Sequence, residues 1–270
     1  MSNRTLSGIV LSVMLAAAPA TRAQVASGPF LPLRLGVDRA LVESGLARSL
    51  QHAFGADTGI AVKLVGGPAL AVLDAVRDGE VDAALTNAPD AEERLDKQGL
   101  VHDRRPIAAG EFVVVGPAPP RVRGKAPPAV GKSGVDALAH IQELATGAPD
   151  SLVFLSAGDG SGTHVVEQAL WRAAHIDPAA AWYTTAAAKE GFAAQVRARG
   201  AYALVERGAW SAQGGAPLAI LAEGDPLLVE SVHAMRAFRI THPAGKIFVA
   251  WIAGGRGRAV VAVHRGYRTP

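Results

Sequence analysis

Short apolar runs alternate with segments of helical periodicity along almost the whole chain, and this alternation constrains the fold more than any other feature. Strands are predicted at 33–36, 60–65, 81–85, 112–115, 152–155, 201–205 and 234–240. Helices are predicted at 46–54, after an N-cap at Ser44, and at 69–77, 90–98, 135–146, 163–174 and 189–199, with two further helical stretches at the end. Such alternation is typical of α/β folds, in which helices cover the faces of a sheet. We therefore predict the α/β class.

Residues 1–23 have the three regions of a secretory signal peptide. Arg4 supplies the basic region, residues 6–17 form an apolar run, and small residues lead to Ala23. The apolar run is short for a membrane span. The chain has no cysteine, which excludes disulfides, thiolate metal sites and a lipid anchor on cysteine. We expect export to the periplasm, with cleavage after Ala23 or Ala26.

The charge balance argues against nucleic-acid binding. The chain has 27 Lys and Arg against 24 Asp and Glu, and Arg4 and Arg22 lie in the predicted leader. The remaining 25 basic and 24 acidic residues give a net charge of +1. Aromatic residues make up only 5% of the chain, so a stacking platform for bases is not apparent either. After the leader no apolar run is long enough for a transmembrane helix, and we expect neither a nucleic-acid partner nor membrane insertion.

Residues 116–134, with the sequence GPAPPRVRGKAPPAVGKSG, interrupt the alternation. Proline, glycine and basic side chains dominate this stretch, as is typical of a surface crossover or a linker. We place a domain boundary near it.

The stretch LSAGDGSGTHVVEQALWRAAHI, residues 155–176, predicts a strand end, a glycine-rich turn and an amphipathic helix. The glycines at 158, 160 and 162 let backbone N–H groups come close together, and the helix directs its unpaired N–H groups and the positive end of its dipole to the same point. Ser161 and Thr163 add neutral hydroxyl donors, which suits a small anion. A simpler interpretation stays open, in which Ser161 only caps the helix and the glycines only form the turn.

Catalytic and metal-binding patterns do not fit this stretch. Ser161 lacks the glycines two residues before and after it that a nucleophile elbow requires, and Thr163 stands where a dinucleotide-binding loop needs its third glycine. The eight histidines include no i, i+4 pair, so a metal site has little support. A hydrolase using Ser161 and His164 would lack a third residue to orient the pair. We expect no catalysis, no metal and no cofactor.

The segment LSAGDGSGTHVVEQALWRAAHIDPAAAWY, residues 155–183, resembles the central segment of TupA-type tungstate-binding proteins of ABC transporters, which belong to the periplasmic oxyanion-binding superfamily. That family carries roughly Ser-Arg-Gly-Asp-x-Ser-Gly-Thr-His there, followed by Leu-Trp and Trp-Tyr. Further stretches agree in order and spacing, at 44–65, 79–107, 111–117, 200–210 and 220–228. The resemblance therefore extends from Leu33 to Leu228.

The resemblance implies a two-lobed, type II periplasmic-binding-protein fold. Each lobe would be a mostly parallel sheet flanked by helices, with the ligand in the cleft between the lobes. Residues 30–113 and 228–270 would form lobe one, 114–227 would form lobe two, and 111–117 and 220–228 would be the crossing strands. Hinge closure would then present the loaded monomer to an ABC permease.

The resemblance also implies a set of ligand-binding residues, from which this chain departs. Asp38 and Arg39 stand in place of a Thr/Ser-rich loop, Ala157 in place of the arginine that pairs with the oxyanion, and Gly67 in a loop without the family's Thr and Lys. The candidate ligand-binding residues are Asp38, Arg39, Gly67, Ser156, Gly160, Ser161, Gly162 and Thr163. Arg39 can replace the lost positive charge or remain solvated or paired with Asp38. The Asp38 carboxylate would repel a dianion unless it is protonated or paired.

The function expected from these features is that of a periplasmic solute-binding component of an ABC importer, which binds tungstate, molybdate or a changed ligand. Loss of high-affinity binding is an equally simple explanation of the altered loops. The alternative function is a sensor or interaction protein that keeps the scaffold with a degenerate ligand site.

Overall fold

A computed structural model describes residues 31–118, 133–147, 152–179, 181–187, 191–214, 217–239 and 242–270. The predicted signal peptide and most of the 116–134 segment lie outside these residues, as do Lys189 and Ile240, each at one end of a predicted element. Among the described residues, we find no helix with both the length and the apolar character needed to cross a membrane.

A mixed sheet of seven strands forms the centre of the molecule. Strand β1 (Leu33–Asp38) is buried at all six residues, as a parallel strand covered on both faces should be. It pairs in parallel with β2 (Val62–Gly67) and β3 (Ala83–Thr86). Next to β3 lie β9 (Val229–Ala237), β4 (Val101–Pro117) and β7 (Ala203–Glu206), and β8 (Leu218–Ala222) also pairs with β4.

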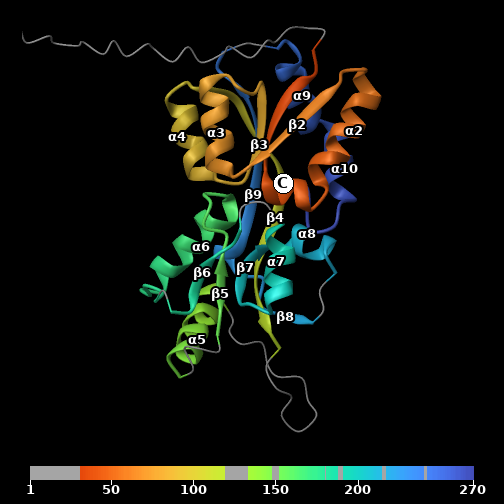
Figure 1. Ribbon diagram of the computed structural model, residues 1–270. Helices are drawn as coiled ribbons and strands as arrows, with labels where there is room; N and C mark the ends of the chain where they lie inside the picture. The colour runs from red at the N-terminus through yellow and green to blue at the C-terminus, as the bar shows by residue number, and fades with distance from the viewer. Residues whose placement is uncertain are drawn as a thin grey trace, which may run out of the picture.

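Strands β4 and β9 run through the middle of the molecule and join two lobes (Figure 1). The helices of lobe one are α1 (Arg39–Glu43), α2 (Leu46–Thr58), α3 (Ala69–Asp78), α4 (Pro89–Lys97), α9 (Ala244–Ala253) and α10 (Gly255–Ala262). Lobe two contains α5 (Gly134–Gly147), α6 (Gly162–Ala173), α7 (Phe192–Arg199), α8 (Arg207–Ala212), the 3-10 turn η1 (Pro226–Leu228) and the parallel pair of β5 (Phe154–Ser156) and β6 (Tyr183–Thr185).

Each lobe has apolar cores on both faces of its sheet, because side chains alternate along a strand. In lobe one, Phe54 and Phe248 pack edge to face on one side, and Val72 and Met235 belong to the core on the other. In lobe two, one core contains a group of aromatic rings, Phe154, Trp171, Trp182 and Tyr183, and the opposite core lies under α7. The α/β class and the two-lobed fold are confirmed.

The strand pairing is more antiparallel than expected. Strands β1, β2 and β3 are parallel, but β9 is antiparallel to both β3 and β4, and β7 and β8 are antiparallel to β4. The parallel pairing in lobe two is that of β5 with β6. The expectation of a mostly parallel sheet in each lobe is therefore wrong for lobe two, because β7 and β8 both return against the long strand β4.

Several elements differ from the sequence prediction. Strand β4 begins at Val101, eleven residues before the predicted start. Its first part was not predicted because two register shifts between 102 and 108 and a positive φ of 56° at Asp103 disrupt the alternation of side chains. Helix α1 was not predicted. Ser44 is the C-cap residue of α1 and Gly45 takes the N-cap position of α2, although the Ser44 Oγ still accepts a hydrogen bond from the Leu46 N–H at 3.3 Å. Residues 220–228 contain the end of β8, a turn and η1 and are not one crossing strand, since β9 starts at Val229.

Candidate functional site

The glycine-rich turn between β5 and α6 has the predicted conformation. Gly158 and Gly160 have φ values of 62° and 78°, which glycine adopts without strain. Ser161 is the N-cap of α6, and its Oγ accepts a hydrogen bond from the His164 N–H at 3.3 Å. The Asp159 carboxylate accepts one from the Ser161 N–H at 2.9 Å. Side chains of the turn itself therefore fix its shape.

The carboxyl group of Asp38 lies at the N-terminus of α6. Asp38 ends β1 and caps α1, where its Oδ1 accepts a hydrogen bond from the Ala40 N–H at 2.9 Å. Its Oδ2 accepts a second from the Gly162 N–H, across the cleft, at 3.2 Å. Burial raises the pKa of Asp38 to about 6, although the N–H groups of Ala40, Gly162 and Ala69 lower it. The point predicted to attract an anion is therefore filled by a carboxylate of the chain itself.

The two lobes touch closely around this carboxylate. The Leu70 N–H of α3 donates to the Gly160 carbonyl oxygen at 3.1 Å. A Cβ atom on Gly162 would lie 2.0 Å from Oδ1 of Asn87, so only glycine allows this approach without a shift of the asparagine. The contact between lobes thus depends on the same turn that caps α6.

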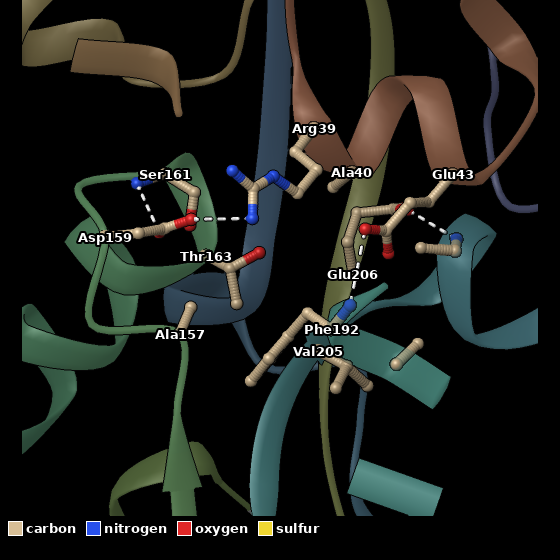
Figure 2. A pocket seen from close by; sticks show the side chains of 12 residues that line it. Arg39, Ala40, Glu43, Ala157, Asp159, Ser161, Thr163, Phe192, Val205 and Glu206 are labelled. Carbon is tan, nitrogen blue, oxygen red and sulfur yellow. Dashed lines mark hydrogen bonds and ion pairs between the residues drawn. The ribbon is translucent and has the colours of Figure 1, made fainter. Parts of the chain in front are cut away.

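A small cavity lies next to this contact (Figure 2). Its central space of about 20 Å³ is large enough for roughly one water molecule. Figure 2 shows Arg39 reaching from α1 toward Asp159, with Nη1 3.7 Å from Oδ2. The lining residues are Arg39, Ala40, Glu43, Ala157, Asp159, Ser161, Thr163, Phe192, Ala193, Val205, Glu206 and Ala209.

Carboxyl groups outnumber cations around this cavity. Oε1 of Glu43 accepts a hydrogen bond at 3.3 Å from the N–H of Phe192, the first residue of α7. The two carboxylate oxygens of Glu206 accept bonds of 2.6 Å from the Gly208 and Ala209 N–H groups in α8. Burial raises the pKa of Glu43 and raises that of Glu206 to about 7. While these groups are ionised, they oppose entry of a further anion.

A second buried carboxyl group, Glu230, lies against Glu206. Its Oε1 accepts a hydrogen bond from the Asn87 amide at 2.6 Å. Burial raises the pKa of Glu230 well above its usual range, and the charge of Glu206 raises it further. Burial and the charge of Glu206 thus both favour the protonated form of Glu230, in which the repulsion between the two groups is reduced.

The structure brings six of the eight predicted residues together. Arg39, Ser161 and Thr163 line the cavity, and Asp38, Gly160 and Gly162 form the contact between lobes. The remaining two lie behind them: Ser156 is fully buried and accepts a hydrogen bond from the Gly158 N–H at 3.1 Å, and Gly67 pairs with Asp38 at the end of β2.

Sequence reasoning missed the roles of Glu43, Asp159 and Glu206. These carboxyl groups are far apart in the chain and belong to no spacing pattern. The position of Glu206 directly before a helix is the one local signal, because a side-chain oxygen there can accept from free N–H groups of the first turn.

The arrangement does not form a Ser–His catalytic pair. Nδ1 of His164 accepts a hydrogen bond from the Gly160 N–H at 3.0 Å, and burial lowers the pKa of the ring. Ser161 Oγ meets the backbone of His164 and not its ring. Within the described ranges, no group of three or more histidine, aspartate or glutamate side chains is arranged to hold a metal ion.

Comparison with known proteins defines the family. Residues 40–244 match the PBP superfamily domain. The tungstate-binding protein TupA of Peptoclostridium acidaminophilum is 30% identical over 228 residues, which cover 81% of this chain and 76% of that protein. The chain belongs to the TupA family of the PBP superfamily.

Two further proteins resemble this TupA-family chain. A Haloferax volcanii protein, provisionally named as an ABC transporter anion-binding protein, is 32% identical over 181 residues. That match covers 67% of this chain, which spans only half the length of the Haloferax protein. The crystal structure of a tungstate ABC transporter protein from Geobacter sulfurreducens is 25% identical, with a TM-score of 0.69, over 87% of this chain and 99% of that one. The predicted resemblance to TupA-type proteins is confirmed.

Proposed function

We propose that this TupA-family chain is the solute-binding component of an ABC importer and binds a small oxyanion, such as tungstate or molybdate, between its lobes. It acts in the periplasm as a monomer, delivers its ligand to a permease and catalyses no reaction. Lobe one comprises residues 30–113 and 228–270, and lobe two comprises 114–227. The names of its relatives, one an ABC transporter anion-binding protein and the other a tungstate-binding protein, support this role.

The observation that carries the proposal is the convergence of N–H groups from both lobes. Ala40 in lobe one and Gly162 in lobe two donate to one carboxylate, that of Asp38. A carboxylate and an inorganic oxyanion accept the same kind of hydrogen bond, so donors arranged for one suit the other. Ser161 and Thr163 lie beside this point on the cavity wall.

Isothermal titration tests the proposal. Protein purified from the periplasm is titrated in turn with tungstate, molybdate, sulfate and phosphate at pH 7.5. We expect saturable binding of tungstate or molybdate, weakened at least tenfold by Thr163→Val, which removes a hydroxyl from the cavity. Asp90→Ser, an exposed change on α4, serves as the control. Absence of heat with all four anions would contradict the proposal.

A second function, that of a sensor or interaction protein, is favoured by one observation. Carboxyl groups of the chain already accept from the helix N-termini that face the cleft: Asp38 at α6, Glu43 at α7 and Glu206 at α8. A scaffold filled in this way needs no solute to bring its lobes together. Capture of a periplasmic sensor domain by protein that binds none of the four anions would support this role.

A further inference from the structure

We propose that Asp38 is a built-in ligand whose carboxylate takes the place of an oxyanion, holds the two lobes together without solute and competes with anions for the same donors. This inference rests on the proposed function for the competition alone, because the contact between the lobes exists whatever the protein binds. The Asp38 side chain has no exposed surface, and its two oxygens accept from opposite lobes.

The geometry of Asp38 matches what a bound oxyanion would require. Its oxygens accept N–H groups at the first turn of two helices, Ala40 of α1 and Gly162 of α6. The N–H of Ala69, at the start of α3, lowers its pKa as well. Three helix N-termini from two lobes thus surround one negative group, and each contributes a positive partial charge. A dianion at this point would have to displace the side chain.

A second carboxylate of the same helix acts in parallel. Glu43, at the other end of α1, accepts from the Phe192 N–H at the start of α7 in lobe two. Between the two carboxylates, Arg39 extends to Asp159 of the α6 turn. Helix α1 is five residues long and, together with its N-cap Asp38, makes three contacts with lobe two through a negative, a positive and a negative side chain.

The charged groups that face Asp38 affect its pKa, and therefore the pH range in which its ionised carboxylate can hold the lobes together. Asp159 of the α6 turn raises the pKa of Asp38, burial raises it more, and Asp38 in turn raises the pKa of Glu230 on β9. Arg39 of α1 forms an ion pair with Asp159, and Glu206 lies next to Glu230. With a pKa of about 6, Asp38 is mainly ionised at pH 7.5 and becomes neutral in mildly acid solution.

The first test measures the separation of the lobes without any anion. The chain has no cysteine, so Asp96→Cys in α4 and Glu143→Cys in α5, both exposed, can carry spin labels in lobe one and lobe two. Asp38→Ser is the decisive variant, because serine still caps α1 but is too short to reach Gly162. We expect a single short distance distribution for the unaltered cleft and a longer, broader one for Asp38→Ser. An unchanged distribution would overturn the proposal.

Glu43→Ala provides a second variant in case Asp38→Ser does not fold, which circular dichroism will show. Glu43 is only half-buried, so its removal leaves the core intact. We expect a longer and broader distance distribution than in the unaltered protein, and an unchanged distribution would overturn the proposal that carboxylates at the two ends of α1 hold the lobes together. Asp90→Ser, which changes the net charge equally on the surface of α4, should leave the distribution unchanged.

The second test measures competition with tungstate as the probe at pH 7.5. We expect Asp38→Ser to bind at least tenfold more tightly than the unaltered protein, and Asp90→Ser to bind like it. Equal affinity in Asp38→Ser and the unaltered protein would overturn the competition. If no variant binds any oxyanion, the proposed function fails, and the separation of the lobes still decides whether Asp38 holds them together.

Discussion

At the scale of single residues, buried carboxyl groups make stability depend on pH. Glu167 of α6 is fully buried, and its Oε1 accepts hydrogen bonds from the Tyr183 hydroxyl at 2.6 Å and the Trp171 indole at 3.3 Å. Burial raises its pKa to about 7, against hydrogen bonds from Tyr183, Ser156 and Trp171 that lower it. The folded chain therefore holds this proton more tightly than the unfolded chain does.

The sign of the pH effect follows from this raised pKa. The stabilisation by Glu167 is complete below its ordinary value of 4.5 and is lost as the pH rises through about 7. Between pH 5 and pH 8 we expect a loss of about 2 kcal/mol in the free energy of unfolding from this group, at about 1.4 kcal/mol per pKa unit. Urea unfolding of wild type and Glu167→Gln at both pH values measures it. Equal losses in the two proteins would show that Glu167 does not titrate in this range.

Two glycines should respond in opposite ways to replacement by alanine. In Gly162→Ala the new Cβ would meet Asn87 at 2.0 Å and push its amide away from Glu230, and we expect a loss of roughly 1–3 kcal/mol. In Gly55→Ala the new Cβ would lie 3.6 Å from the Ile60 carbonyl oxygen, an ordinary contact in the middle of α2, and we expect a gain of roughly 0.5–1 kcal/mol. Chemical denaturation of both variants checks the pair, and a loss in Gly55→Ala would contradict the helix propensity argument.

The sequence predicts only the local part of the candidate site. Ser161 as an N-cap and the glycine turn follow from neighbouring residues, because caps and turns are made within a few positions. The Asp38 to Gly162 hydrogen bond joins residues 124 positions apart, and the sequence spacing contains no trace of it. From the sequence, Asp38 would repel a dianion unless it was protonated or paired, and in the structure the Ala40 and Gly162 N–H groups pair with it.

At the scale of secondary-structure elements, Asp225 links η1 to the start of α5. Its Oδ1 caps η1 through the Leu227 N–H at 2.9 Å, and its Oδ2 accepts from the Gly134 N–H at 2.7 Å. Because Asp225→Ala leaves both donors without this partner, we expect a loss of roughly 2–4 kcal/mol. Thermal unfolding compares it with Asp136→Ala, an exposed change in the first turn of α5 that should cost less than about 1 kcal/mol. Similar losses in the two variants would refute this role.

The elements that the sequence predicts well have one regular apolar face. Helix α3 buries Ala69, Val72, Leu73 and Val76 at helical spacing and lies within one residue of its prediction. The first eleven residues of strand β4 and the whole of helix α1 were missed, for different reasons. Register shifts break the alternation in β4, and α1 is too short to show a period. Irregular or short elements depend on tertiary partners, which local patterns do not contain.

At the scale of the whole molecule, the two lobes share the strands β4 and β9 and should unfold together. Three of the four tryptophans, Trp171, Trp182 and Trp210, are buried in lobe two, whereas Trp251 lies on α9 in lobe one. Fluorescence of Trp251→Phe therefore reports on lobe two, and far-UV circular dichroism reports on both lobes. We expect their denaturation midpoints to coincide, since neither sheet is complete without the shared strands. Separate midpoints would show that the lobes fold independently.

The continuity of β4 has a mechanical consequence. The strand has 17 residues and pairs with β9 as far as Glu111 and with β7 from Phe112. At about 3.3 Å per residue the strand spans at most roughly 55 Å, and less where the register shifts between 102 and 108 disturb it. Any opening of the cleft has to bend β4 and its partner β9, because both strands pass from one lobe to the other. The unstrained shape of these two strands favours one angle between the lobes, and the hydrogen bond from Gly162 to Asp38 selects the angle at which the lobes are held. Replacing Asp38 would thus change the range of angles between the lobes without any change in the strands β4 and β9 themselves.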